Sequence, residues 1–112
     1  MIKVFAYLKR KPGLSMEEFV DYYEHNHVPL VLSKAAMPVV YKRNYLQRGD
    51  TFNLEGDEIG FDCMTELVFN DRDGLLGWMT SLGGDEIARD EENFIHRDAT
   101  RSYVVDERTS SG

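Results

Sequence analysis

His27 is the side chain of this sequence with the clearest potential for proton transfer. It continues an apolar stripe in which Met16, Phe19, Val20 and Tyr23 recur at three- and four-residue spacing. Such a stripe is the inward face of a helix, and four residues after Tyr23 it arrives at an imidazole. An imidazole titrates with an unperturbed pKa of about 6.5, so a histidine that faces a cavity can exchange protons near neutral pH.

Two interpretations of His27 are open, and spacing alone favours the structural one. In that interpretation the imidazole binds the last free carbonyls of the helix, or lies as a cation near the negative end of the helix dipole. In the functional interpretation it exchanges protons with a ligand in a cavity. His25 falls on the side of Glu18 and Asp21, so we expect it to be solvated.

Other polar and aromatic side chains are further candidates for a site. Tyr41 and Tyr45 share one face of a predicted strand, where they form either a core edge or the wall of a pocket for an aromatic ligand. Asp62 and Glu66 share another strand face, at a pocket, an interface or a solvated edge. His96 lies in a polar turn, where a surface role is the more common one.

The helix that carries His27 has a predicted start and a predicted stop. Ser15 and Glu18 have the spacing of a capping box, in which each side chain binds the backbone of the other residue. Pro29 disfavours helical geometry in the residue before it, so we expect the helix to end at His27 or Val28. The run 31–38 is ambiguous, with space for a short helical turn before Pro38.

The remaining chain divides into strands, helices and a long connection. Alternating or doubly apolar segments predict strands at 2–9, 39–48, 61–69 and 100–106. A helix capped by Asn70 or Asp71 ends at the glycines 83–84, and a short acidic helix follows over 85–95. The glycine-rich segment 49–60 is a long hairpin connection, of a length common in lids and binding loops.

Composition limits the class of protein. A chain of 112 residues forms one domain, which we place at 1–107 with a disordered tail at 108–112. The net charge of −7 argues against a nucleic-acid or anionic-membrane partner, and no apolar run is long enough for a membrane helix. The single cysteine, Cys63, and the absence of a signal-peptide pattern predict a reducing, cytoplasmic location. No GxGxxG, Walker-type or metal-ligand cluster occurs, so no cofactor or metal is expected.

The order strand, helix, strand, strand, helix, strand predicts an α+β, ferredoxin-like βαββαβ fold with a four-stranded antiparallel sheet. Helices on one face of such a sheet leave the other face bare. The first and third strands carry apolar residues on both sides, so we expect the bare face to be buried against a second copy in a homodimer.

The opening MIKVFAYLKRKPG leads into the helix pattern F-x-x-Y/H-W/Y-E-x-x-H-x-P-L, which is supplied here by Phe19, Tyr22, Tyr23, Glu24, His27, Pro29 and Leu30. Further motifs are the Y-x-R-N-Y segment at 41–45, FDCMTELVF, and the ending DEENFIHRDATRSYVVDE. In these segments the chain resembles the EthD family. His27 matches the family's histidine at the helix end, whereas His96 stands where members often carry an aspartate.

The resemblance implies a dimeric α+β barrel and a cofactor-independent lyase or isomerase that acts on an aromatic or polyketide-like carbonyl compound. His27 would take a proton next to the carbonyl. The enolate oxygen would be stabilised, or a leaving hydroxyl protonated, by Tyr41, Tyr45 or His96. Side chains that would hold a flat substrate are Phe5, Tyr23, Tyr45, Trp78 and Asp62. The alternatives are a noncatalytic protein that binds a hydrophobic ligand and a cofactor-free monooxygenase; a haem role has no local support.

Overall fold

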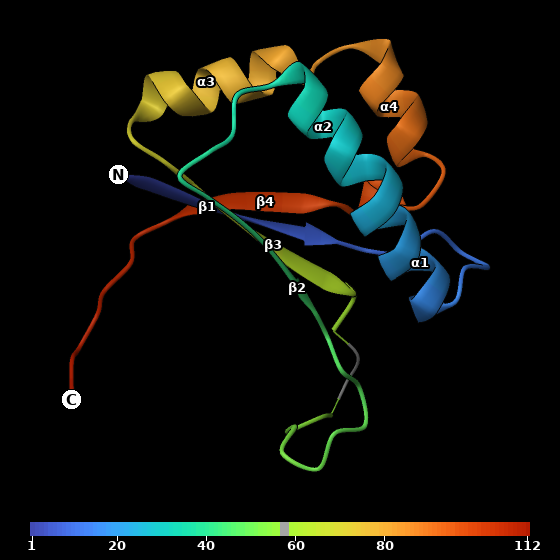
Figure 1. The fold of residues 1–112 in the computed structure, drawn as a ribbon. Coiled ribbons are helices and arrows are strands. Elements are labelled where there is room, and N and C mark those ends of the chain that lie inside the picture. The colour runs from blue at the N-terminus through green and yellow to red at the C-terminus, as the bar shows by residue number, and fades with distance from the viewer. Residues whose placement is uncertain (57–58) are drawn as a thin grey trace.

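The chain forms a four-stranded antiparallel sheet with its helices gathered on one face (Figure 1). The computed structural model describes residues 1–56 and 59–112, so the predicted 49–60 connection lies partly outside the described residues. The strands are β1 (Ile2–Leu8), β2 (Val40–Tyr45), β3 (Cys63–Phe69) and β4 (Arg101–Val105), in the order β2-β3-β1-β4. The α+β, ferredoxin-like fold class is therefore confirmed.

The helical segments lie close to the predicted positions, with one exception around Pro29. Their bounds are α1 (Met16–Tyr22), η1 (Tyr23–His27), α2 (Val28–Lys34), α3 (Arg72–Ser81), α4 (Asp85–Glu91) and η2 (Arg97–Ala99). The capping box is present: the Glu18 amide donates to Ser15 Oγ over 3.1 Å, and the Ser15 amide donates to Glu18 Oε1 over 2.9 Å. Asp71 caps α3 by accepting from the Gly74 amide.

The prediction that Pro29 ends the first helix is wrong. The helical path continues from α1 through η1, a π-helical turn, into α2, which runs to Lys34. In the π turn the Val28 amide donates to the carbonyl of Tyr23, five residues earlier. This wide turn starts a new helical register in which Pro29 lies in the first turn of α2, where a missing amide hydrogen costs little.

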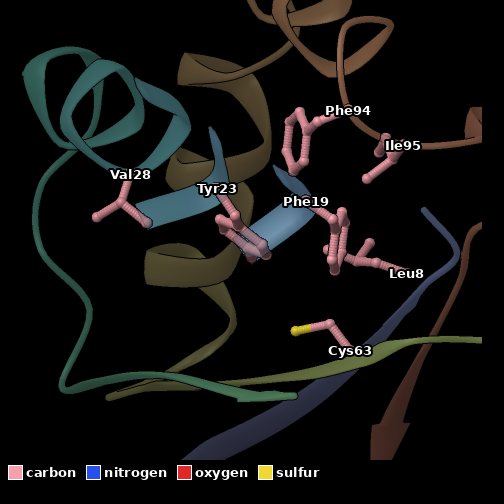
Figure 2. Close-up of a cluster of buried hydrophobic side chains, with 7 residues drawn as sticks. All are labelled: Leu8, Phe19, Tyr23, Val28, Cys63, Phe94 and Ile95. Atoms are coloured by element: carbon pink, nitrogen blue, oxygen red, sulfur yellow. The ribbon is translucent and has the colours of Figure 1, made fainter. Parts of the chain in front are cut away.

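The core lies between the helices and the inner face of the sheet (Figure 2). Strand pairing and side-chain alternation place Leu8 and Cys63 opposite each other on this face. Phe19, Tyr23 and Phe94 cover them from the helical side and are buried. The core therefore joins the helix that carries His27 to the segment after α4.

The outer face of the sheet carries no helix (Figure 1). The strand register places on it the residues that alternate with the core positions, among them Phe5, Tyr7, Val40, Met64, Val68 and Tyr103. Tyr7 packs edge-to-face against Phe61, with ring centroids 4.9 Å apart. Tyr103 is 60% exposed, so this mostly apolar face is open at the β4 edge.

No helix in the described part of the chain has the length and apolar character needed to cross a membrane.

Candidate functional site

The π turn places His27 between the helices and directs it toward α4. The residue is 8% exposed. Its ring lies 4.8 Å from that of Phe94 and 5.4 Å from that of Tyr23, centroid to centroid. The hydrogen bond of its Nδ1 goes to the side chain of Asp90 and not to a backbone carbonyl at the end of its own helix.

Asp90 on α4 is the hydrogen-bond partner of His27. Its Oδ2 lies 2.7 Å from Nδ1 of the imidazole, and the two side chains are 12% and 10% exposed. Within the described residues Nε2 makes no hydrogen bond, and it is not among the buried atoms that lack a partner. The arrangement is thus an imidazole bound by a carboxylate at Nδ1, with an Nε2 atom that is not fully buried although the residue as a whole is.

Asp90 also joins two further side chains. The hydroxyl of Tyr22 donates to Asp90 Oδ1 over 2.7 Å, and Nδ2 of Asn93 donates to the Tyr22 hydroxyl oxygen over 2.9 Å. Burial raises the pKa of Tyr22, and the bond to Asp90 raises it further, so its hydroxyl stays protonated. The Tyr22 ring stacks on Phe94 at 5.2 Å.

A second carboxylate near this cluster is Glu91. Burial raises its pKa, while the nearby His27 and Arg97 act in the opposite direction. Arg97 Nε lies 3.5 Å from Glu91 Oε1. The side chains that α4 presents to His27 therefore include two acidic groups, Asp90 and Glu91.

A separate polar cluster lies between η1 and β2. Glu24 accepts hydrogen bonds from Arg43 Nε (2.9 Å) and Nη2 (its Oε1, 2.6 Å), and from the Tyr45 hydroxyl (2.5 Å). The Arg43 guanidinium lies 4.9 Å from the ring centroid of Tyr41. Arg43 lowers the pKa of Glu24 by hydrogen bonding, and burial raises the pKa of Tyr41 to about 12. Burial also raises the pKa of Tyr45, so both hydroxyls are protonated at neutral pH.

The structure brings only one of the predicted site residues, Tyr23, into contact with His27. The Tyr23 hydroxyl is bonded to Thr65 at 2.7 Å and points to the sheet. Tyr45 is bonded to Glu24, and Tyr41 packs edge-to-face on Trp78 at 5.6 Å. Tyr41 and Tyr45 thus lie on the inner face of the sheet, Trp78 of α3 packs on Tyr41, and none of the three makes a ring contact with the imidazole in the described residues.

Two other predicted residues, Phe5 and Asp62, are held elsewhere in the structure. Phe5 alternates with Val4, a core residue, and so points to the outer face. The carboxylate of Asp62 accepts hydrogen bonds from the Arg10 amide at 2.8 Å and from the Arg48 guanidinium at 2.7 Å. Asp62 thereby links the residues that follow β1 to the residues that follow β2. These contacts give Asp62 a structural role.

His96 lies beside a surface cavity near η2. Nδ1 of His96 is buried without a hydrogen-bond partner in the described part of the chain. A surface cavity of about 270 Å³ adjoins it, with Lys11 and Arg97 at its rim. His96 therefore belongs to the loop beside η2, and in the described part of the chain no hydrogen bond or ring contact joins it to His27.

Asp90, Tyr22 and Asn93 were missed by the sequence analysis, although a signal for Asp90 was present. Asp90 lies three residues after Ile87 and four before Phe94, so it falls on the apolar stripe of its short helix. Ile87 and Phe94 are both buried. An acidic residue between two buried apolar residues at helical spacing indicates a buried carboxylate that needs a partner.

Comparisons with known proteins agree with the fold. A family model described as the EthD domain matches residues 11–98. The structure is similar to that of At3g17210 from Arabidopsis thaliana, with a TM-score of 0.70, 12% identity and 99% of each chain covered. It is also similar to an ethyl tert-butyl ether D (EthD) family protein from Bacillus halodurans, with a TM-score of 0.62 and 19% identity. The match covers 96% of this chain and 100% of that protein's chain. A comparison with curated proteins finds no match.

Proposed function

Because this chain belongs to the EthD domain family, we propose that it catalyses proton transfer on a carbonyl-containing small molecule of the aromatic or polyketide type. The proposed activity is that of a cofactor-independent lyase or isomerase, with His27 as the general acid and base. The observation that carries the proposal is the 2.7 Å contact between Asp90 and His27 Nδ1, which leaves Nε2 open.

The proposed reaction needs one base and a substrate with an acidic C–H bond. Nε2 of His27 removes the proton from the carbon next to the carbonyl, and the C–H electron pair forms the enolate. Asp90 stabilises the resulting imidazolium. The imidazolium then returns the proton either to another carbon of the enolate system, which isomerises the substrate, or to a hydroxyl that leaves as water.

Exchange of α-carbon protons for deuterium tests this first step without knowledge of the final product. A panel of aromatic and polycyclic ketones is incubated with the protein in D₂O and followed by NMR. We expect enzyme-dependent exchange of at least one ketone and a loss of roughly 100-fold or more in His27→Gln, the size typical of a removed acid–base group.

His25→Gln is the matched control, because His25 lies two residues earlier and its side chain is 74% exposed. It should exchange at the wild-type rate. Equal exchange by the wild type and His27→Gln, or no exchange of any ketone by the wild type, would contradict the proposed catalysis.

A second candidate is a noncatalytic protein that binds a hydrophobic ligand. The observation in its favour is a surface cavity of about 510 Å³, lined by Tyr7, Phe61 and Tyr103 and remote from His27. This candidate predicts micromolar ligand binding that survives His27→Gln and no exchange by the purified protein.

We also propose that the outer face of the sheet joins two copies of the chain. Apolar side chains occupy much of this face, together with positively and negatively charged side chains such as Lys3 and Glu66, whose charged atoms lie 3.5 Å apart. Mixed signs suit a face that meets its own copy across a two-fold axis. The proposed occupant is a second identical chain.

A further inference from the structure

We propose that Asn93, Tyr22 and Asp90 form a directional hydrogen-bond chain that keeps a proton on Nδ1 of His27 and leaves Nε2 as the proton acceptor. The three are positioning residues, because they act through the imidazole. The catalytic meaning of this inference rests on the proposed function, but the position of the proton is a property of the free protein.

The direction of the chain is set at Asp90. Its carboxylate only accepts, so the single hydroxyl hydrogen of Tyr22 donates to Asp90 Oδ1 at 2.7 Å. The oxygen of Tyr22 is then left as an acceptor, and Nδ2 of Asn93 donates to it over 2.9 Å. Asn93 thus supports the direction in which the phenol donates.

The direction continues through Asp90 to the imidazole. A carboxylate accepts hydrogen bonds and donates none, so the contact of Oδ2 with His27 Nδ1 at 2.7 Å requires a hydrogen on Nδ1. A neutral imidazole has one N–H, so its Nε2 carries a lone pair. This is the tautomer that a base acting through Nε2 needs.

The other groups around His27 do not compete for Nδ1. Glu91 is engaged by Arg97 at 3.5 Å, and Tyr23 directs its hydroxyl to Thr65 at 2.7 Å. Phe94 and Tyr23 contribute only ring contacts. Asp90 is therefore the group that selects the tautomer.

The test is the ¹⁵N NMR spectrum of protein labelled in histidine, recorded above neutral pH without substrate. We expect the wild type to show one neutral tautomer for His27, with an N–H signal at Nδ1 and an unprotonated signal at Nε2. His25, whose exposed Nδ1 contacts Asp21 at 3.0 Å, serves as the reference within the same spectrum.

Asp90→Asn should reverse the tautomer. Tyr22 still needs an acceptor, so the amide oxygen of the new side chain turns to Tyr22 and its NH₂ group turns to His27. Nδ1 then becomes the acceptor and the proton moves to Nε2. Exchange of substrate protons should fall by about 10³- to 10⁴-fold, as expected for a histidine in the wrong tautomer.

Adding Tyr22→Phe to Asp90→Asn should restore the original tautomer at least in part. The phenylalanine keeps the ring that stacks on Phe94 but no longer demands an acceptor, so the amide can turn its oxygen to His27. Asp21→Asn is the matched control on the exposed pair and should leave the spectrum of His27 unchanged.

A wild-type signal with the proton on Nε2 would overturn the inference, as would an Asp90→Asn variant that retains Nδ1–H. So would a double variant whose tautomer equals that of Asp90→Asn. The wild-type spectrum decides the matter even if a variant does not fold. The expected tautomer without ketone exchange would refute the proposed function alone, whereas exchange with the opposite tautomer would refute the chain alone.

Discussion

At the scale of single residues, Glu24 of η1 shows how hydrogen bonds stabilise a half-buried charged side chain. Its side chain is 29% exposed and accepts hydrogen bonds from Arg43 and Tyr45. Arg43 is the main cause of its lowered pKa, so the folded protein binds the Glu24 proton more weakly than the unfolded chain does. The ionised carboxylate therefore contributes to stability.

We expect Glu24→Gln to lower the free energy of unfolding by roughly 1.5–3 kcal/mol at pH 7, the range for hydrogen bonds to a charged group. Urea denaturation measures this loss. Because the folded pKa lies below the ordinary 4.5, the advantage of Glu24 is fully present above pH 4.5 and is lost as the pH falls through the folded value.

The difference between the wild type and Glu24→Gln should therefore narrow below pH 4.5. Glu17→Gln, an exposed position on α1, is the matched control and should change stability by less than about 0.5 kcal/mol. A gap between wild type and Glu24→Gln that is independent of pH would show that charge is not the stabilising property.

At the scale of elements, the π turn η1 is the feature that places His27 opposite α4. Tyr23, at its start, is buried against the sheet, and His27, at its end, is buried against Asp90. One residue in an α-helix corresponds to a rotation of about 100°. The wide turn is therefore what lets these two residues satisfy different partners.

We expect deletion of Asn26, an exposed residue within η1, to be much more harmful than its replacement. Without it the segments before and after the turn differ in phase by about 100°, so Tyr23 and His27 cannot both keep their partners. The loss should be about 3 kcal/mol or more, the size expected for breaking a buried polar network.

Asn26→Ala keeps the length of the turn and should cost less than about 0.5 kcal/mol, because the side chain is at the surface. Both variants are compared by urea denaturation and by the His27 signals in ¹⁵N NMR. A deletion variant of wild-type stability with an unchanged His27 spectrum would show that the π turn is dispensable.

At the scale of the whole molecule, the outer sheet face is notable because none of the described helices covers it (Figure 1). Adjacent residues on the edge strand β4 allow a precise comparison of the two faces. Tyr103 pairs with Phe5 and points to the outer face, while Val104 pairs with Val4 and points to the helical side. Both are exposed, at 60% and 49%.

We expect the wild type to sediment as a dimer and Tyr103→Glu to shift the equilibrium toward monomers, since a buried carboxylate at an apolar interface is costly. Val104→Glu is the matched control, because it places the same charge one residue away on the other face. Sedimentation velocity measures both. A monomeric wild type, or dissociation by Val104→Glu alone, would contradict a dimer formed through the outer face.

The sequence by itself determined the order of the elements and most of the core. The capping box, the strand alternation and the glycine stops act within a few residues of one another, so their outcome can be read from spacing. The buried position of His27 followed from the same periodicity, since it is the continuation of the stripe through Phe19 and Tyr23. The apolar residues on both sides of β1 could also be identified from the sequence.

Only the tertiary structure decided which polar groups meet. His27 and Asp90 are separated by 63 residues, and Tyr22 and Asn93 by 71, so no local pattern pairs them. Phe5 and Tyr41 were expected near one ligand, yet strand pairing puts them on opposite faces of the sheet. The π turn also escaped prediction. Local spacing fixes each element and its buried stripe, whereas the packing of α4 against α1 and η1 fixes the chemistry of the site.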